Sequence, residues 1–289
     1  GYLAPAGTLA GTCVLFAGGP QGLGELLLLL AGCVLAGLFA TIMRAHATAP
    51  IATLLLGALF WVGGCALWLG GAPLVKVVPW WAGFLILTIA GERLELAALG
   101  RLTRAGRSSF TGLTAFFVCG LVLDAFAAGT GIRLTGAALV GYAFWLARFD
   151  IARRTLHRPG LPRFVALSLL PGYLWLAIGG ALWLWHGAAL AGPSHDAELH
   201  AIFVGFVFSM IFGHAPVIFP GVVGIAIPFR RVFYVHLSLL HIGLALRIVG
   251  DLDGDFQLAQ RGALVIATAI AIFLVATIGS AVLNRAARR

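Results

Sequence analysis

Residues 51–70 read IATLLLGALFWVGGCALWLG, a run without a single charged side chain. As an α-helix such a run spans about 30 Å, which is the thickness of the hydrocarbon core of a bilayer. Similar apolar runs recur along the whole 289-residue sequence, in which hydrophobic residues make up 61% and charged residues only 10%. The sequence therefore predicts an integral membrane protein built almost entirely from membrane-spanning helices.

Short turn-like segments rich in glycine, proline and aspartate separate the apolar runs. Because no soluble linker interrupts the chain, residues 1–289 are predicted to form a single integral membrane domain, an all-α transmembrane bundle. Ten spans are expected, at about 2–18, 22–43, 51–70, 77–98, 110–128, 132–148, 163–187, 198–218, 231–249 and 261–284.

The basic residues fall mainly on one side of this arrangement. Fourteen lie in or beside the loops after spans 2, 4, 6 and 8 or at the C-terminal end, and four lie on the other side. The positive-inside rule then predicts that both ends face the cytoplasm, with a bacterial inner membrane as the expected location. Arginines confined to short loops also argue against a nucleic-acid partner. The cysteines lie within apolar runs without a CxxC spacing, so no disulfide framework is predicted.

Four of the eight histidines lie inside expected spans. An ionisable side chain at membrane depth is costly and by default marks a functional site. The alternative is a neutral histidine that bonds a backbone carbonyl or a serine of a neighbouring helix. The four are His200, His214, His236 and His241, whereas His46, His157, His186 and His195 are expected to be interfacial and wet.

The depth of these histidines suggests a shared site. His214 lies near the inner end of its span, His236 lies at a similar depth in the next span, and His241 is about 7.5 Å further along. A cross-helix pair of imidazoles can hold haem iron, and a closer cluster of three can hold copper. His214, His236 and His241 are therefore the predicted metal ligands, with His214 the strongest candidate.

His200 is a further candidate for cofactor binding, because it lies 14 residues before His214 and, on α-helical periodicity, on nearly the same face. The surrounding phenylalanines could line a macrocycle, and Gly205 and Gly213 are expected to leave room for it. His236 and His241 point about 140° apart on a helix, so we do not expect them to bind one ion together.

Charged side chains inside spans form a second set of candidates. Glu92, Arg93 and Glu95 stand close together, and three readings stay open for them: pairing within the protein, contact of Arg93 with haem propionates, or proton relay. Asp124 is expected either to pair with Arg133 or to take part in proton uptake.

The segment HAIFVGFVFSMIFGH at 200–214 resembles the histidine-led helix of the NnrS family, with an H-A-x-x-x-G start and a later M-I-x-G. Those are polytopic bacterial membrane proteins that contain haem and copper and are associated with nitric oxide metabolism. The nearly loop-free layout is also similar. The resemblance lies in the C-terminal half, and the WHAHE-like histidine cluster of that family is absent from the N-terminal half. It implies haem b and/or copper as cofactors.

The predicted function is that of a haem- and/or copper-binding membrane protein of respiratory or nitrogen-oxide metabolism. Two alternatives stay open: an accessory subunit of a larger membrane complex or respiratory chain, with other subunits or redox partners besides the lipid bilayer, and a transporter with the charged residues along its path. No phosphate loop, nucleophile elbow or HExxH motif occurs, so neither a hydrolase nor a nucleotide enzyme is predicted and no catalytic residue is assigned.

Overall fold

The computed structural model describes residues 2–100, 102–127, 129–187 and 189–286, and in these ranges the chain forms helices and no strand. The chain divides into two compact units, Gly1–Arg101 and Leu102–Arg289. The single domain expected over residues 1–289 stays a prediction.

The N-terminal unit consists of four helices that pack in chain order, each against the next. Glycines bring these helices close together. A Cβ on Gly57 of the third helix would lie 3.1 Å from the backbone oxygen of Phe84 on the fourth, which is the small-residue contact that helix pairs in lipid use. The four helices are α1 (Leu3–Phe16), α2 (Gln21–Ala45), α3 (Ala49–Leu69) and α4 (Leu74–Leu99).

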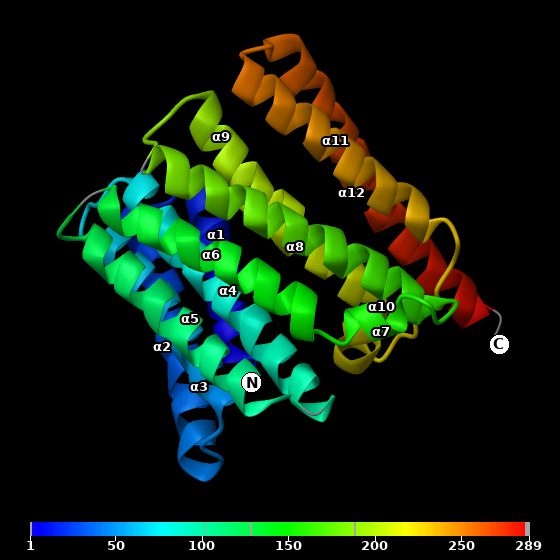
Figure 1. The fold of residues 1–289 in the computed structure, drawn as a ribbon, viewed down its shortest axis with the longest axis horizontal. Helices are drawn as coiled ribbons and strands as arrows, with labels where there is room; N and C mark the ends of the chain where they lie inside the picture. The colour runs from blue at the N-terminus through cyan, green and yellow to red at the C-terminus, as the bar shows by residue number, and fades with distance from the viewer. Residues whose placement is uncertain (1, 101, 128, 188, 287–289) are drawn as a thin grey trace. The chain divides into compact units, whose positions relative to one another are not determined.

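The C-terminal unit contains the remaining helices (Figure 1). Helix α5 packs on α6, α6 on α8, and α8 on η1 and α10, while α11 and α12 form a tightly packed hairpin. The helices are α5 (Arg104–Asp124), α6 (Thr130–Phe149), α7 (Ala152–Thr155), α8 (Leu161–His186), α9 (Pro193–Leu199), the π-helix η1 (His200–Phe208), α10 (Ser209–Val223), α11 (Phe233–Asp253) and α12 (Phe256–Ala286). Because α9, η1 and α10 follow one another without a break, residues 193–223 form one long helix.

Helices α6 and α8 approach each other through a pair of facing glycines. A Cβ on Gly136 would lie 2.5 Å from the Gly180 oxygen, and a Cβ on Gly180 would lie 2.7 Å from the Gly136 oxygen. Both distances are too short for a real side chain, so glycine is required at both positions for this crossing.

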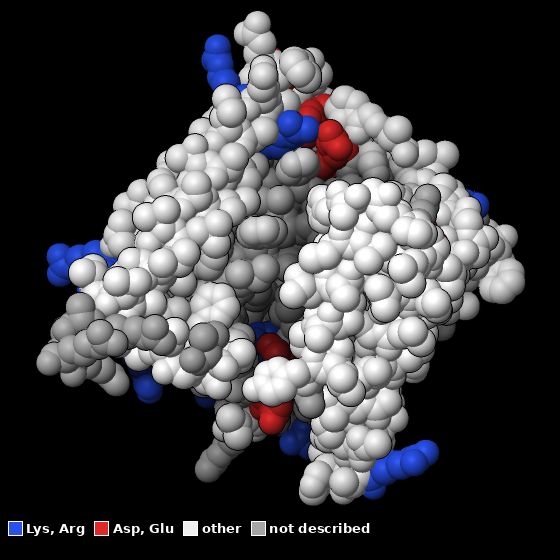
Figure 2. Space-filling model, turned by 180° about the vertical axis from the view of Figure 1, so that it is seen from behind, with Lys and Arg blue, Asp and Glu red and all other residues white. Residues whose placement is uncertain are grey.

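Each of the ten expected spans coincides with a helix of the structure. Among the described residues, eight helices are long and apolar enough to cross a membrane. The two that fall short are α1, which has only 14 residues, and α6, whose arginines at 133 and 148 lower its mean hydropathy. Uncharged side chains also dominate the face shown in Figure 2, where the charged ones form separate small groups. The chain is an integral membrane protein; the count of ten spans and the cytoplasmic location of both ends stay predictions.

Candidate functional site

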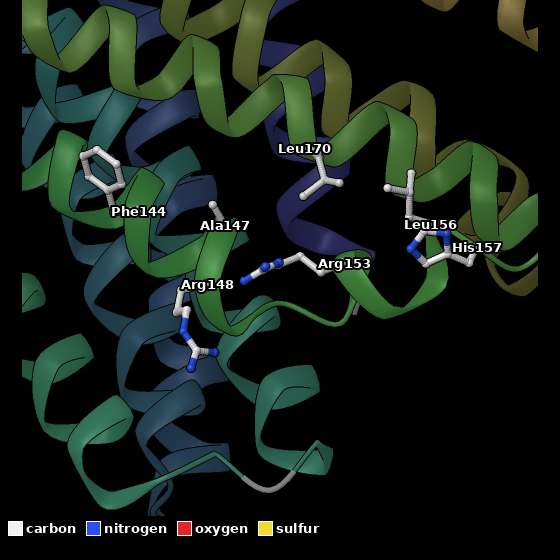
Figure 3. Close-up of a pocket in the computed structure, with 7 residues that line it drawn as sticks. All are labelled: Phe144, Ala147, Arg148, Arg153, Leu156, His157 and Leu170. Carbon is white, nitrogen blue, oxygen red and sulfur yellow. The ribbon is translucent and has the colours of Figure 1, made fainter.

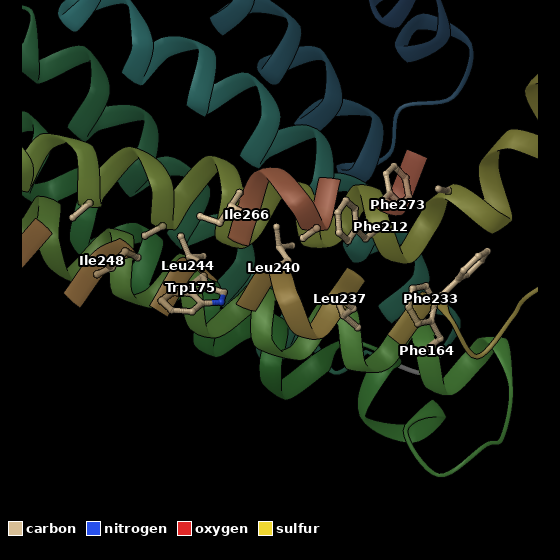
Figure 4. Packing of buried hydrophobic residues seen from close by; sticks show 14 of the residues in the cluster. Phe164, Trp175, Phe212, Phe233, Leu237, Leu240, Leu244, Ile248, Ile266 and Phe273 are labelled. Atoms are coloured by element: carbon tan, nitrogen blue, oxygen red, sulfur yellow. The ribbon is translucent and has the colours of Figure 1, made fainter. Parts of the chain in front are cut away.

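His236 is an isolated ionisable side chain in the core of the C-terminal unit. Only 1% of its surface is exposed, and neither ring nitrogen has a hydrogen-bond partner. Four phenylalanine rings surround it: Phe212 at 4.8 Å, Phe273 at 5.3 Å, Phe233 at 5.6 Å and Phe164 at 6.0 Å between ring centroids. These rings come from α10, α12, α11 and α8 and belong to the apolar core of the unit (Figure 4).

The cost of this arrangement calls for an explanation. Each buried polar atom without a partner destabilises a fold by about 1–3 kcal/mol, and native structures contain few of them. An orphaned imidazole at membrane depth is therefore a candidate ligand for a bound group.

His241 lies five residues further along α11 in different surroundings. The Trp175 indole Nε1–H donates to its Nδ1 at 3.0 Å, and its Nε2 is buried without a partner. Because indole can only donate, Nδ1 must be the acceptor, and in the neutral ring Nε2 carries the proton. While this bond stands, neither nitrogen of His241 offers a lone pair to a metal. His236 and His241 thus have different surroundings, and His241 is the weaker of the two as a ligand.

His200 and His214 have the opposite tautomer to His241, with the proton on Nδ1 and not on Nε2. Nδ1 of His200 donates to the Asp196 carbonyl at 2.8 Å, and Nδ1 of His214 donates to the Met210 carbonyl at 2.7 Å. A carbonyl can only accept, so Nε2 carries the lone pair in both neutral rings. Metal-binding histidines commonly have their tautomer fixed in this way. On α10, the side chain that contacts His236 is Phe212. Residues two apart on a helix face different directions, so His214 points away from His236.

The π-helix η1 changes the geometry expected for residues 200–214. Its wide turns cover His200–Phe208, so α-helical periodicity does not predict which face His200 shares with His214. The π-helix ends where the Ser209 hydroxyl donates to the Gly205 carbonyl.

Gly205 and Gly213 were predicted to leave room for a macrocycle, but side chains of α8 occupy that space. A Cβ on Gly205 would overlap Trp175, and a Cβ on Gly213 would lie 2.9 Å from Ser168.

A polar cluster that the sequence did not reveal lies where the end of α8 meets α9. The Glu198 side chain is 1% exposed and faces two imidazoles, with Oε1 3.3 Å from Nδ1 of His186 and Oε2 3.9 Å from Nδ1 of His195. His186 and His195, expected to be wet, are thus partly buried against a carboxyl group. The spacing of His195 and Glu198 in SHDAELH was the available signal, since residues three apart on a helix are neighbours.

A network of ion pairs joins α9 to the end of α11. The Arg247 guanidinium donates to Asp251 through Nε and to Asp196 through Nη2, both at 2.9 Å. The Asp251 side chain is only 5% exposed, so this arginine neutralises a buried carboxylate. Across the described ranges, no three histidine, cysteine, aspartate or glutamate side chains are arranged to hold a metal ion.

The charged candidates predicted in other spans, in α4 and at the end of α5, lie outside the surroundings of His236. Arg93 is buried in α4 of the N-terminal unit, and Glu92 and Glu95 beside it are exposed. The role of Arg93 toward a cofactor stays a prediction. Asp124 neither pairs with Arg133 nor stands alone: its Oδ1 accepts the backbone N–H groups of residues 129 and 132 at 3.0 and 3.3 Å, and so caps α6.

These features define a polytopic helical membrane protein with an unpartnered histidine in the core of its C-terminal unit. Residues 1–282 match the family described as a domain of unknown function, DUF8744, and the chain belongs to that family. No curated protein and no solved structure matches the chain.

Proposed function

We propose that this protein is an integral membrane protein that binds a histidine-ligated metal cofactor in its C-terminal unit, with haem favoured over copper and His236 as the principal ligand. The observation that carries the proposal is the pair of buried, unpartnered nitrogens of His236 inside a cage of phenylalanine rings. A metal ion would satisfy one of them, and an apolar macrocycle would match the rings around it.

The donor set favours haem. A copper site of the usual kind needs about three protein ligands, and no group of three donors is assembled in the described parts of the chain. Haem needs only one or two imidazoles, because the porphyrin supplies the other ligands. The rings of Phe212 and Phe273 stack at 4.3 Å beside His236, so we expect them to separate when a macrocycle binds.

Of the other two candidates, His214 has the tautomer of a ligand and His241 does not, but His214 faces away from His236, so we propose His236 as the sole imidazole ligand. In His214 the nitrogen opposite the Met210 carbonyl carries the lone pair, whereas Trp175 fixes His241 in the other tautomer. When bound, haem would supply one-electron transfer or binding of a small gas molecule. The resemblance to the NnrS family suggests nitrogen-oxide metabolism as the setting, with a bacterial inner membrane as its location.

Optical spectroscopy with metal analysis tests the proposal. Purified protein is expected to show a haem absorption band that changes on reduction with dithionite. His236→Leu should abolish it, and His241→Leu should retain it. His46→Leu is the matched control, because His46 is an exposed histidine at the end of α2. A wild-type protein with neither haem nor stoichiometric copper, or a His236→Leu variant with full cofactor content, would show the proposal to be wrong.

The open alternatives differ in what they predict for the same preparation. An accessory subunit would co-purify with other membrane proteins, with or without its own cofactor. A transporter would take up substrate into proteoliposomes in the absence of bound metal.

A further inference from the structure

A hollow of about 640 Å³ lies in the C-terminal unit where α6, α7 and α8 meet. Figure 3 shows the side chains around it, with the Arg153 side chain extending toward the end of α6, where Arg148 lies. The volume is within the range of small-molecule sites, about 300–1,000 Å³. The lining residues are Phe144, Ala147, Arg148, Arg153, Leu156, His157 and Leu170.

The charge of the hollow is one-sided. Two guanidinium groups line it, and no carboxylate is among its lining residues. The nearest carboxylate in the sequence, Asp150, is buried, and its Oδ1 accepts the backbone N–H of Ala152 at 2.6 Å. The Arg148 guanidinium lies over the Phe149 ring at 5.2 Å, a contact that leaves its charge in place. Two guanidinium groups in a hollow whose lining contains no carboxylate are well suited to bind a phosphate.

The position of the hollow indicates where such a phosphate comes from. Arg148 lies in the last turn of α6 and Arg153 in the short helix α7 that follows, at the end of a predicted span, where lipid headgroups are expected. The apolar part of the lining faces the membrane, because the Phe144 side chain is 70% exposed and Leu174, one turn of α8 beyond Leu170, is 60% exposed. A ligand that fits both parts has an anionic phosphate head and an apolar tail.

We propose that this hollow binds the headgroup of an anionic phospholipid, with Arg148 and Arg153 on the phosphate and the acyl chains along Phe144 and Leu170. The site lies at the connection that the positive-inside pattern predicts to face the cytoplasm, where basic pockets between helices recognise anionic lipids. The proposal does not depend on a cofactor at His236.

Native mass spectrometry of the purified protein, titrated with phosphatidylglycerol or phosphatidylcholine, tests the site. We expect phosphatidylglycerol to bind more tightly. Each guanidinium near the surface contributes about fivefold in affinity, so the double variant Arg148→Gln/Arg153→Gln should weaken phosphatidylglycerol binding by about thirtyfold. The same variant should bind phosphatidylcholine unchanged.

The matched control is the double variant Arg104→Gln/Arg107→Gln. It removes the same charge from exposed positions at the start of α5, on the same predicted side of the membrane but outside the hollow. An equal loss in both double variants would overturn the proposal, because it would indicate general attraction to basic loops.

Competition with sodium phosphate separates lipid from free phosphate. If inorganic phosphate binds the hollow as tightly as phosphatidylglycerol does, the apolar lining contributes nothing and the lipid proposal is wrong. If the double variant does not fold, the single variant Arg153→Gln carries the test, with an expected loss of about fivefold.

Discussion

His236→Leu in cofactor-free protein should raise the free energy of unfolding. Leucine keeps the apolar burial and removes two unpartnered nitrogens, which together cost about 4 kcal/mol at the middle of their range. The main loss is the two edge-to-face contacts with Phe212 and Phe273, worth about 2 kcal/mol in total. The expected net effect is a stabilisation of about 2 kcal/mol.

His241→Leu provides the contrast. It removes one unpartnered nitrogen but leaves the Trp175 indole without its acceptor and loses that hydrogen bond. The expected net effect is a destabilisation of about 1 kcal/mol. Unfolding of both variants in detergent micelles, followed by tryptophan fluorescence, measures the two changes. A His236→Leu protein that is less stable than the wild type would refute the reasoning, because its nitrogens would then have partners in the apoprotein.

Three further predictions concern the fold. Gly136→Leu should lower the melting temperature through a loss of about 1–3 kcal/mol, because its side chain would meet the backbone of α8; unchanged melting would show that α6 and α8 do not cross there. Arg247→Leu should cost about 1–3 kcal/mol by leaving the buried Asp251 carboxylate without its partner, and denaturant unfolding should show this loss largely reversed when Asp251→Leu is added. Cysteines placed at positions Asp253 and Arg153 in a cysteine-free background should react with a membrane-impermeant reagent from opposite sides; labelling from one side alone would contradict the predicted topology.

The sequence was sufficient to predict the helices, because each apolar run must satisfy its backbone hydrogen bonds internally in a bilayer. It also placed His236 inside a helix. It could not predict the surroundings of His236, since three of the four phenylalanines around it come from other helices.

The remaining differences depend on contacts between residues that are distant in the sequence. Glu198 meets His186 only because α9 folds back on the end of α8. Gly205 was expected to make space and instead admits Trp175. Residue spacing along a helix carries no information about such contacts, so the candidate site was predicted by residue type and not by arrangement.

The π-helix between His200 and Phe208 has a consequence for mutagenesis by deletion. A wide π-turn holds one residue more than an α-helical turn, so the residues after it lie about 100° away from the positions that an uninterrupted α-helix would give them. Removing one residue within this segment is therefore absorbed when a wide turn becomes an α-helical one, whereas removing one from the regular helix α10 would turn Asp196 and His200 relative to α8 and α11 while leaving the composition of the span almost unchanged. Hydropathy would not register the change, but the bond from Arg247 to Asp196 would be lost. The regular part of this helix is consequently more sensitive to its length than to the identity of most of its apolar side chains.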